Sequence, residues 1–139
     1  FNLTFPYNTP LGSDYRIRVT STSNPAWTDT SEGQFTISPA ITVTSPDGGE
    51  IWQQGSMHPI TWTFAGNPGP AVKIEALRGE TVLAVVTPST SIGTGGTGSY
   101  TLTFPTNTPL GNNYRIRVSS TSYPACTDTS NGMFAISAG

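Results

Sequence analysis

Few side chains in this sequence could do acid–base or covalent chemistry. The single histidine, His58, stands beside Pro59 at the start of a predicted strand, and the single cysteine, Cys126, follows 68 residues later in a predicted loop. Nucleophilic catalysis needs a nucleophile and a base within hydrogen-bond reach, and no G-x-S-x-G elbow is present. The carboxylates available for paired acid–base work fall mostly in predicted turns or on solvent faces: Asp47, Glu50, Glu75, Glu80 and Asp128. We therefore expect no enzymatic activity.

Metal and cofactor sites are not expected either. One histidine and one cysteine cannot close a tetrahedral zinc site. Calcium takes several oxygen ligands, and Asp128 with its neighbouring hydroxyls, or Asp47 with Glu50, could supply some of them. We expect instead that Asp128 and Asp29 cap their own loops through side-chain to backbone hydrogen bonds. The glycine-rich stretch 93–97 lacks the GK[ST] ending of a phosphate loop, so it is expected to be a flexible turn.

Four side chains are candidates for contact with a ligand or a neighbouring domain. Trp27 and Tyr123 belong to a polar loop that occurs twice in the chain, where aromatic rings could stack on sugars or fill an interface. The two copies differ at both aromatic positions, so a sugar site shared by the copies is not expected. Arg115 and Arg117 alternate with apolar residues and should point away from the core. They could pair across strands with groups such as Glu75, or bind a neighbouring domain.

The composition is typical of an extracellular β-protein. Charged residues are 10 % of the chain, whereas about 25 % is usual in soluble domains. Polarity comes instead from hydroxyls, since threonine and serine supply 38 residues. The net charge of −2 gives no basic footprint for nucleic acid. The sequence contains no run of about 18 apolar residues, so it predicts no membrane-spanning helix.

A duplicated stretch organises the chain. Residues 1–38 and residues 100–137 are identical at 27 of 38 positions, at a constant offset of 99. Such an offset suits one small β-sandwich domain with its linker. We therefore predict two units: residues 1–39, the last three strands of a truncated repeat, and residues 40–139, a complete repeat.

Alternation of apolar and polar residues predicts an all-β fold. The complete repeat should hold about eight short strands separated by turn residues, which is typical of an immunoglobulin-like sandwich. Trp52 and Trp62 are expected to anchor its core. Tyr15 and Tyr114 each follow a Leu-Gly pair at the entry to a strand, the pattern of a tyrosine corner. Strands are expected near residues 1–5, 15–19, 34–38, 41–45, 50–53, 58–64, 71–78, 81–87, 100–104, 113–120 and 133–137.

The complete repeat resembles a known cell-surface module. The similarity lies in the stretch TSPDGGE at 44–50, in Trp52, Gly55, Ile60 and Trp62, and in the segments VKI at 72–74, YRIRV at 114–118 and DTS at 128–130. Together these are similar to the immunoglobulin-like domain of Kre9/Knh1-type cell-wall proteins, also found as a tandem repeat in secreted bacterial and archaeal proteins. The resemblance implies an extracellular, surface-attached protein and, through fungal relatives linked to β-1,6-glucan, a connection with wall polysaccharide. It implies no catalytic residues.

The truncated copy is the strongest functional clue in the sequence. Three strands on their own would leave an apolar face in water, at a cost of roughly 1.5–3 kcal/mol for each large side chain. Something must cover this face. One explanation is that the chain is an excerpt of a longer array, or one subunit of a filament, and we favour this. The other is that a neighbouring chain donates the missing strands. The face consists of Phe1, Leu3, Phe5, Tyr15, Ile17, Val19, Phe35 and Ile37.

The expected function is therefore structural. We predict a component of an extracellular filament, stalk or adhesin shaft, built from tandem or head-to-tail immunoglobulin-like domains, whose partners are neighbouring copies of itself. The alternative is a carbohydrate-binding module of the cell wall, and a third hypothesis is a calcium-dependent adhesion module. No nucleic acid and no membrane span is expected.

Overall fold

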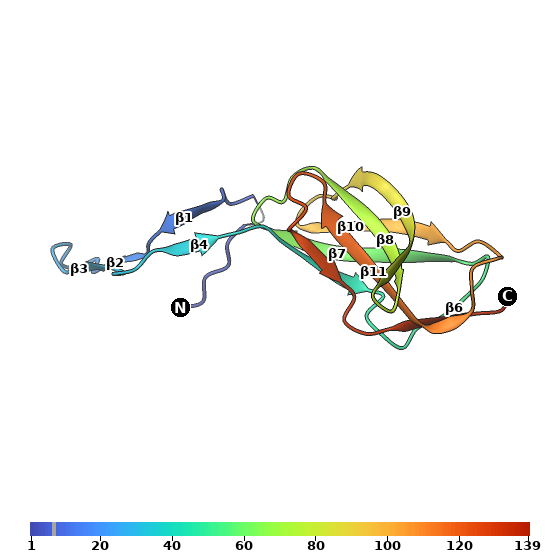
Figure 1. Cartoon of the computed structure of the whole chain (residues 1–139). Coiled ribbons are helices and arrows are strands. Elements are labelled where there is room, and N and C mark those ends of the chain that lie inside the picture. Colours follow the sequence, from blue (N-terminus) through green and yellow to red (C-terminus); the bar gives the residue numbers. More distant parts are fainter. Residues whose placement is uncertain (7) are drawn as a thin grey trace.

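The computed structural model describes residues 1–6 and 8–139 as a β-sandwich with an N-terminal arm that stands clear of it (Figure 1). None of the described residues forms a helix, so none of them makes a helix that could cross a membrane. The arm contains four short strands: β1 (Gly12–Tyr15), β2 (Arg18–Thr20), β3 (Thr28–Thr30) and β4 (Phe35–Ile37). Strand β1 pairs with β4, and β2 pairs with β3.

Two sheets make the sandwich. The smaller sheet has the order β10-β7-β5, formed by β10 (Thr97–Thr103), β7 (Met57–Ala65) and β5 (Ala40–Ser45). The larger sheet has the order β6-β13-β11-β8-β9, with β12 paired to β11 off this path. Its strands are β6 (Ile51–Gln53), β8 (Ala71–Arg78), β9 (Thr81–Ser91), β11 (Gly111–Ser120), β12 (Thr127–Thr129) and β13 (Phe134–Ser137). This confirms the predicted immunoglobulin-like sandwich.

The core lies between the two sheets, where alternate residues of each strand point inward. Along β11 the buried positions are Tyr114, Ile116, Val118 and Ser120, and the residues between them are only partly covered. Trp62 of β7 is buried, and its indole nitrogen donates to the carbonyl of Ile92 at 2.8 Å. Both tryptophans that were expected to anchor the core, Trp52 and Trp62, belong to it.

The tyrosine corner is present in both copies. The hydroxyl of Tyr114 donates to the carbonyl of Pro109 at 2.5 Å. The hydroxyl of Tyr15 makes the equivalent bond to the carbonyl of Pro10 at 2.6 Å. Because the bond joins residues five apart in the chain, the corner forms whether or not the rest of the sandwich is in place.

Some predicted elements were wrong. Residues 1–5 form no strand, although the equivalent residues 100–103 belong to β10. The first copy also has two short strands, β1 and β2, where the second has the continuous β11. In both cases the second copy has a strand alongside, β7 or β8, that the first lacks. The stretch 88–99, which separates the strands predicted at 81–87 and 100–104, is largely taken up by the ends of β9 and β10.

Candidate assembly interface

Each complete domain of this fold consists of two half-sandwiches, and the chain contains one of these halves once and the other half twice. We call residues 41–99 the front half, and residues 1–38 and 100–137 the first and second rear halves. In the second rear half, Gly111 pairs with Ile136 and Tyr114 with Phe134. In the first rear half the equivalent pairs form, with Gly12 opposite Ile37 and Tyr15 opposite Phe35. The two rear halves therefore share one strand register.

Local hydrogen bonds explain why the first rear half keeps this shape. Strands β2 and β3 pair Arg18 with Thr30 and Val19 with Asp29, the same register as β11 with β12. The amide of Ile17 donates to the hydroxyl of Ser31 at 3.1 Å, and Ile116 makes the same bond to Ser130 at 3.1 Å. All these bonds stay within one rear half, so its backbone geometry does not need the front half.

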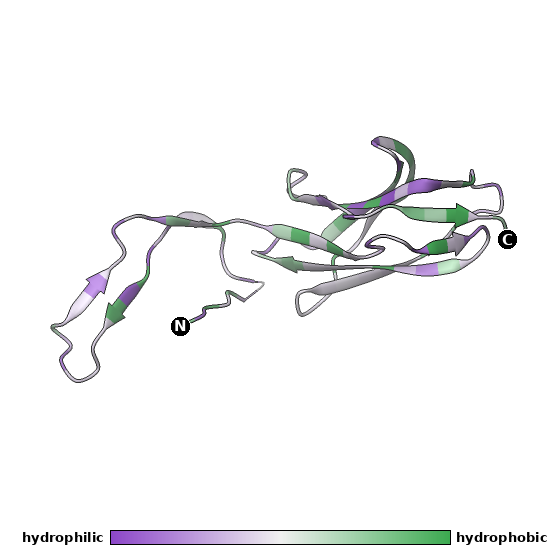
Figure 2. Ribbon diagram, turned by 90° about the horizontal axis from the view of Figure 1, so that it is seen from below, coloured by the Kyte–Doolittle hydropathy of each residue, from purple (hydrophilic) through white to green (hydrophobic). Residues whose placement is uncertain are grey.

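Burial separates the two copies. The exposed fraction is 71 % for Val19 and 43 % for Ile17, whereas the equivalent Val118 and Ile116 are both at 0 %. Figure 2 shows hydrophobic residues on the strands of the arm, clear of the sandwich. The first rear half therefore presents an apolar face in the shape of a sandwich layer.

The front half is what covers the second rear half. Strand β8 pairs with β11 from Tyr114 to Ser120, β7 pairs with the whole of β10, and β6 pairs in parallel with β13. The equivalent edges of the first rear half are open within the described residues. An open edge carrying apolar side chains is a template for pairing with another strand.

Polar contacts also join the front half to the second rear half. A carboxylate oxygen of Asp128 accepts the amide of Val43 at 2.7 Å. This bond ties β12 to β5 and does not close the loop of Asp128, so the expectation that Asp128 caps its own loop was wrong. The hydroxyl of Ser120 donates to the carbonyl of Pro68 at 2.6 Å. Asp29 and Ser21 stand at the equivalent positions of the first rear half.

The two arginines of β11 have different surroundings. Arg117 donates twice to one oxygen of Glu75, from Nε at 3.1 Å and from Nη2 at 3.0 Å. Lys73 lies 3.5 Å from the other oxygen of Glu75, which is buried. Arg115 lies opposite Leu77, and its Nε is buried with no hydrogen-bond partner among the described residues. Arg117 therefore pairs across strands within its own domain.

The two loop aromatics do not form one site. Trp27 lies in the loop between β2 and β3, and Tyr123 lies in the equivalent loop between β11 and β12. Both are exposed, Trp27 more than Tyr123. At the position of Trp27 the second copy has Cys126, which is buried. A complete domain therefore encloses this position, and the exposure of Trp27 reflects the missing cover.

His58 and Cys126 have structural surroundings. The His58 ring stacks on Trp52, with centroids 4.4 Å apart and planes within 4°. Its Nε2 lies 2.8 Å from the Ser56 hydroxyl, and burial lowers its pKa. Burial raises the pKa of the Cys126 thiol, which makes it a poor nucleophile at neutral pH. Among the described residues, no three of His, Cys, Asp and Glu are grouped to hold a metal ion.

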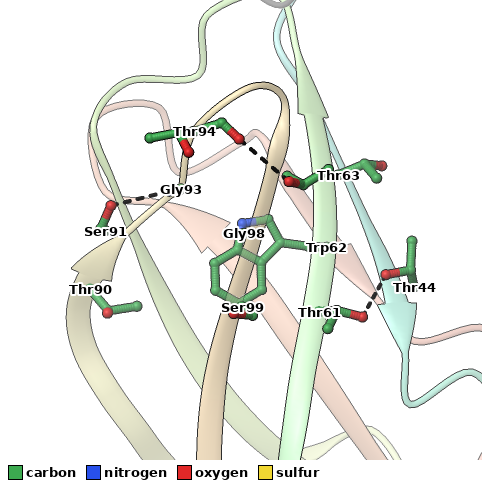
Figure 3. A pocket seen from close by; sticks show the side chains of 11 residues that line it. Thr44, Thr61, Trp62, Thr63, Thr90, Ser91, Gly93, Thr94, Gly98 and Ser99 are labelled. Atoms are coloured by element: carbon green, nitrogen blue, oxygen red, sulfur yellow. Dashed lines mark hydrogen bonds between the residues drawn. The ribbon is translucent and has the colours of Figure 1, made fainter.

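A hydroxyl-lined hollow of about 490 Å³ lies between the smaller sheet and the end of β9 (Figure 3). Its floor includes Trp62, but this ring is buried against Gly98 and offers no face to a ligand. Thr44 and Thr61 hydrogen-bond one another at its rim, at 2.7 Å. The hollow can offer hydroxyls to a polar ligand but has no stacking platform. Its lining is Thr44, Thr61, Trp62, Thr63, Thr90, Ser91, Gly93, Thr94, Thr97, Gly98 and Ser99.

The connection between the truncated repeat and the complete repeat is short and crowded. Only Ser38 and Pro39 separate β4 from β5, at the predicted boundary between residues 39 and 40. Gly66, after β7, packs on this junction with φ of +69°. A Cβ on Gly66 would lie 2.3 Å from the Ser38 carbonyl oxygen and 3.1 Å from the Pro39 Cα. Glycine is therefore required here by both conformation and space.

A comparison with protein families identifies the family to which this domain belongs. The model of the Kre9/KNH-like N-terminal Ig-like domain matches residues 45–131, which is more than half of the chain. The chain belongs to the Kre9/KNH-like family. The matched region runs from the end of β5 to just beyond β12, so it joins most of the front half to most of the second rear half. The family is a cell-wall-associated one. A search of curated proteins found no match.

Proposed function

We propose that this Kre9/KNH-like protein is a structural component of an extracellular filament, stalk or adhesin shaft. Its domains are joined end to end, and its role is non-catalytic. The observation that carries the proposal is the junction, where the last strand of one repeat leads into the first strand of the next after two residues, Ser38 and Pro39. A connection this short does not act as a flexible linker.

The junction has two features that stiffen it. Pro39 has a fixed φ angle. Gly66 brings the β7–β8 loop against the backbone of both junction residues. Repeats joined in this way keep one rotation from each domain to the next, so an array of them forms a rod or helix. The cell-wall association of the family and the hydroxyl-rich composition support a location outside the cell.

Electron microscopy of the native material tests the assembly. We expect rods or filaments of uniform width, and isolated globules would contradict the proposal. A variant tests the stiffness: Gly66→Val places a side chain against Ser38, whereas Gly95→Val strains a glycine of similar φ, +63°, with no atom within 4 Å. Small-angle scattering should show a broader range of arm positions for Gly66→Val than for the Gly95→Val control.

Carbohydrate binding is a second candidate, supported by the hydroxyl-lined hollow of Figure 3 and by the exposed indole of Trp27. A glycan array probed with the whole chain tests it. If the hollow binds sugars, Thr61→Val should weaken binding and Trp27→Ala should leave it unchanged. If the loop between β2 and β3 binds sugars, Trp27→Ala should weaken binding and Thr61→Val should leave it unchanged. An array with no bound glycan removes this candidate.

A further inference from the structure

We propose that the apolar face of the first rear half is the docking surface for a further front half, a segment with the pattern of residues 41–99, joined to Phe1 in the same polypeptide. This deepens the proposed function, because it names the partner that completes each domain of the shaft. The docking proposal rests on the tandem arrangement of domains in the proposed function, and it does not require the junction to be stiff.

The second rear half shows what the docking surface receives. Its strand edges pair with β6, β7 and β8, and β5 packs against β11 and β12 from the facing sheet. All four of these strands belong to the front half. The first rear half has the same apolar types at the equivalent positions, with Leu3, Ile17 and Val19 for Leu102, Ile116 and Val118. It also has the same backbone register. A surface that matches in residue types and geometry fits the same occupant.

Polar groups at the docking surface match that occupant as well. Arg18 stands where Arg117 binds Glu75 of the front half, and within the described residues no carboxylate lies beside it. Asp29 stands where Asp128 accepts the amide of Val43. Gly33 stands where Gly132 donates its amide to the carbonyl of Asp47 at 2.8 Å. An occupant of the front-half pattern supplies a partner for each of the three.

A second copy of this chain fits the surface less well. Each copy contains one front half and two rear halves. A neighbouring copy could cover residues 1–38 with its front half only by uncovering its own residues 100–137. A front half in the same polypeptide has no such deficit. Strand β10 also runs without a break across the boundary between residues 99 and 100. In the complete domain the front half is therefore joined to the rear half within one strand.

An extended chain tests the proposal, made by placing a copy of residues 41–99 directly before Phe1 of the whole chain. Hydrogen exchange of amides in β1–β4 is compared between the extended and the original chain. We expect exchange in residues 1–38 to slow about tenfold or more, approaching the rate of the equivalent peptides from 100–137. Those peptides also report whether the extended chain has folded.

Two matched substitutions in the extended chain locate the contact. Val19→Asp should abolish the new protection, because Val118 is fully buried at the equivalent position. Leu11→Asp should preserve it, because the equivalent Leu110 is exposed. Trp27→Cys provides a second readout, since a thiol there should resist labelling in the extended chain, as the buried Cys126 does, and react quickly in the original chain.

The proposal is overturned if residues 1–38 exchange equally fast in the extended and the original chain while residues 100–137 stay protected. It is likewise overturned if the Trp27→Cys thiol is labelled equally fast in both chains. It is also overturned if residues 1–38 of the original chain become protected as its concentration rises, because a second copy would then be the occupant. Protection of the extended chain combined with a flexible junction in scattering would leave this inference standing and contradict the stiff shaft.

Discussion

Cutting the same side chain at two equivalent positions should give very different losses of stability. Ile116 and Ile17 have identical neighbours in the sequence and identical amide bonds to a serine hydroxyl, but Ile116 is fully buried and Ile17 is 43 % exposed. Replacing a buried isoleucine by alanine costs about 2–5 kcal/mol of unfolding free energy. A substitution on an uncovered surface usually changes it by less than about 0.5 kcal/mol.

Urea unfolding of the whole chain measures both variants. The signal is fluorescence in a Trp27→Phe background, which leaves Trp52 and Trp62, both in the core of the complete domain. We expect Ile116→Ala to lower the midpoint strongly at an unchanged m value, and to lower the melting temperature by about 8 °C or more. Ile17→Ala should leave the curve in place. Equal losses for the two variants would refute the argument, because Ile17 would then be covered.

Three further predictions concern polar groups. Tyr114→Phe removes the corner bond and should cost about 0.5–1.5 kcal/mol in thermal unfolding, whereas Tyr15→Phe should not affect the domain. Glu75→Gln weakens the buried pair with Arg117 and should cost about 1–3 kcal/mol; a double-mutant cycle with Arg117→Met measures the coupling. Burial would raise the pKa of Glu50, but backbone amide donors lower it below the ordinary 4.5, so stability should fall as pH drops below 4.5, with a shallower slope in Glu50→Gln.

Each of these predictions has an outcome that contradicts it. Equal effects of the two tyrosine variants would mean that the arm and the domain unfold together. A coupling energy near zero would show that solvent screens the Glu75 pair. An unchanged acid slope in Glu50→Gln would mean that the carboxylate titrates alike in the folded and unfolded chain, against the bonds it accepts from the amides of Asp47 and Gly48 at 2.8 and 2.9 Å.

Local patterns predicted much of the fold. Period-two alternation indicated the strands that became β7, β8 and β11, because a strand between a core and solvent must alternate. The Leu-Gly and tyrosine spacing predicted both corners, since that bond spans only five residues. The duplication predicted that residues 1–38 are the rear of a sandwich, and the shared register of the two copies agrees with it.

Contacts between distant residues were not predictable in the same way. The sequence contains the carboxylate of Asp128 but does not show that it reaches Val43, 85 residues away. Pairing of Arg117 with Glu75 was one of the expected alternatives, but Glu75 was also expected among the solvent-facing acids, and its burial depends on the register of β8 against β11. Residues 1–5 show the opposite case, because their alternation is sound but no strand lies beside them to complete a sheet.

By itself, the sequence determined most of the strands, both corners and the presence of a repeated half-sandwich, because each depends on residues close together in the chain. The tertiary structure decided which apolar faces are covered. Val19 and Val118 follow the same four residues and pair equivalently with β3 and β12, yet one is exposed and the other buried. The difference arises because burial depends on the strands packed opposite, and in the described structure the front half covers only the second copy.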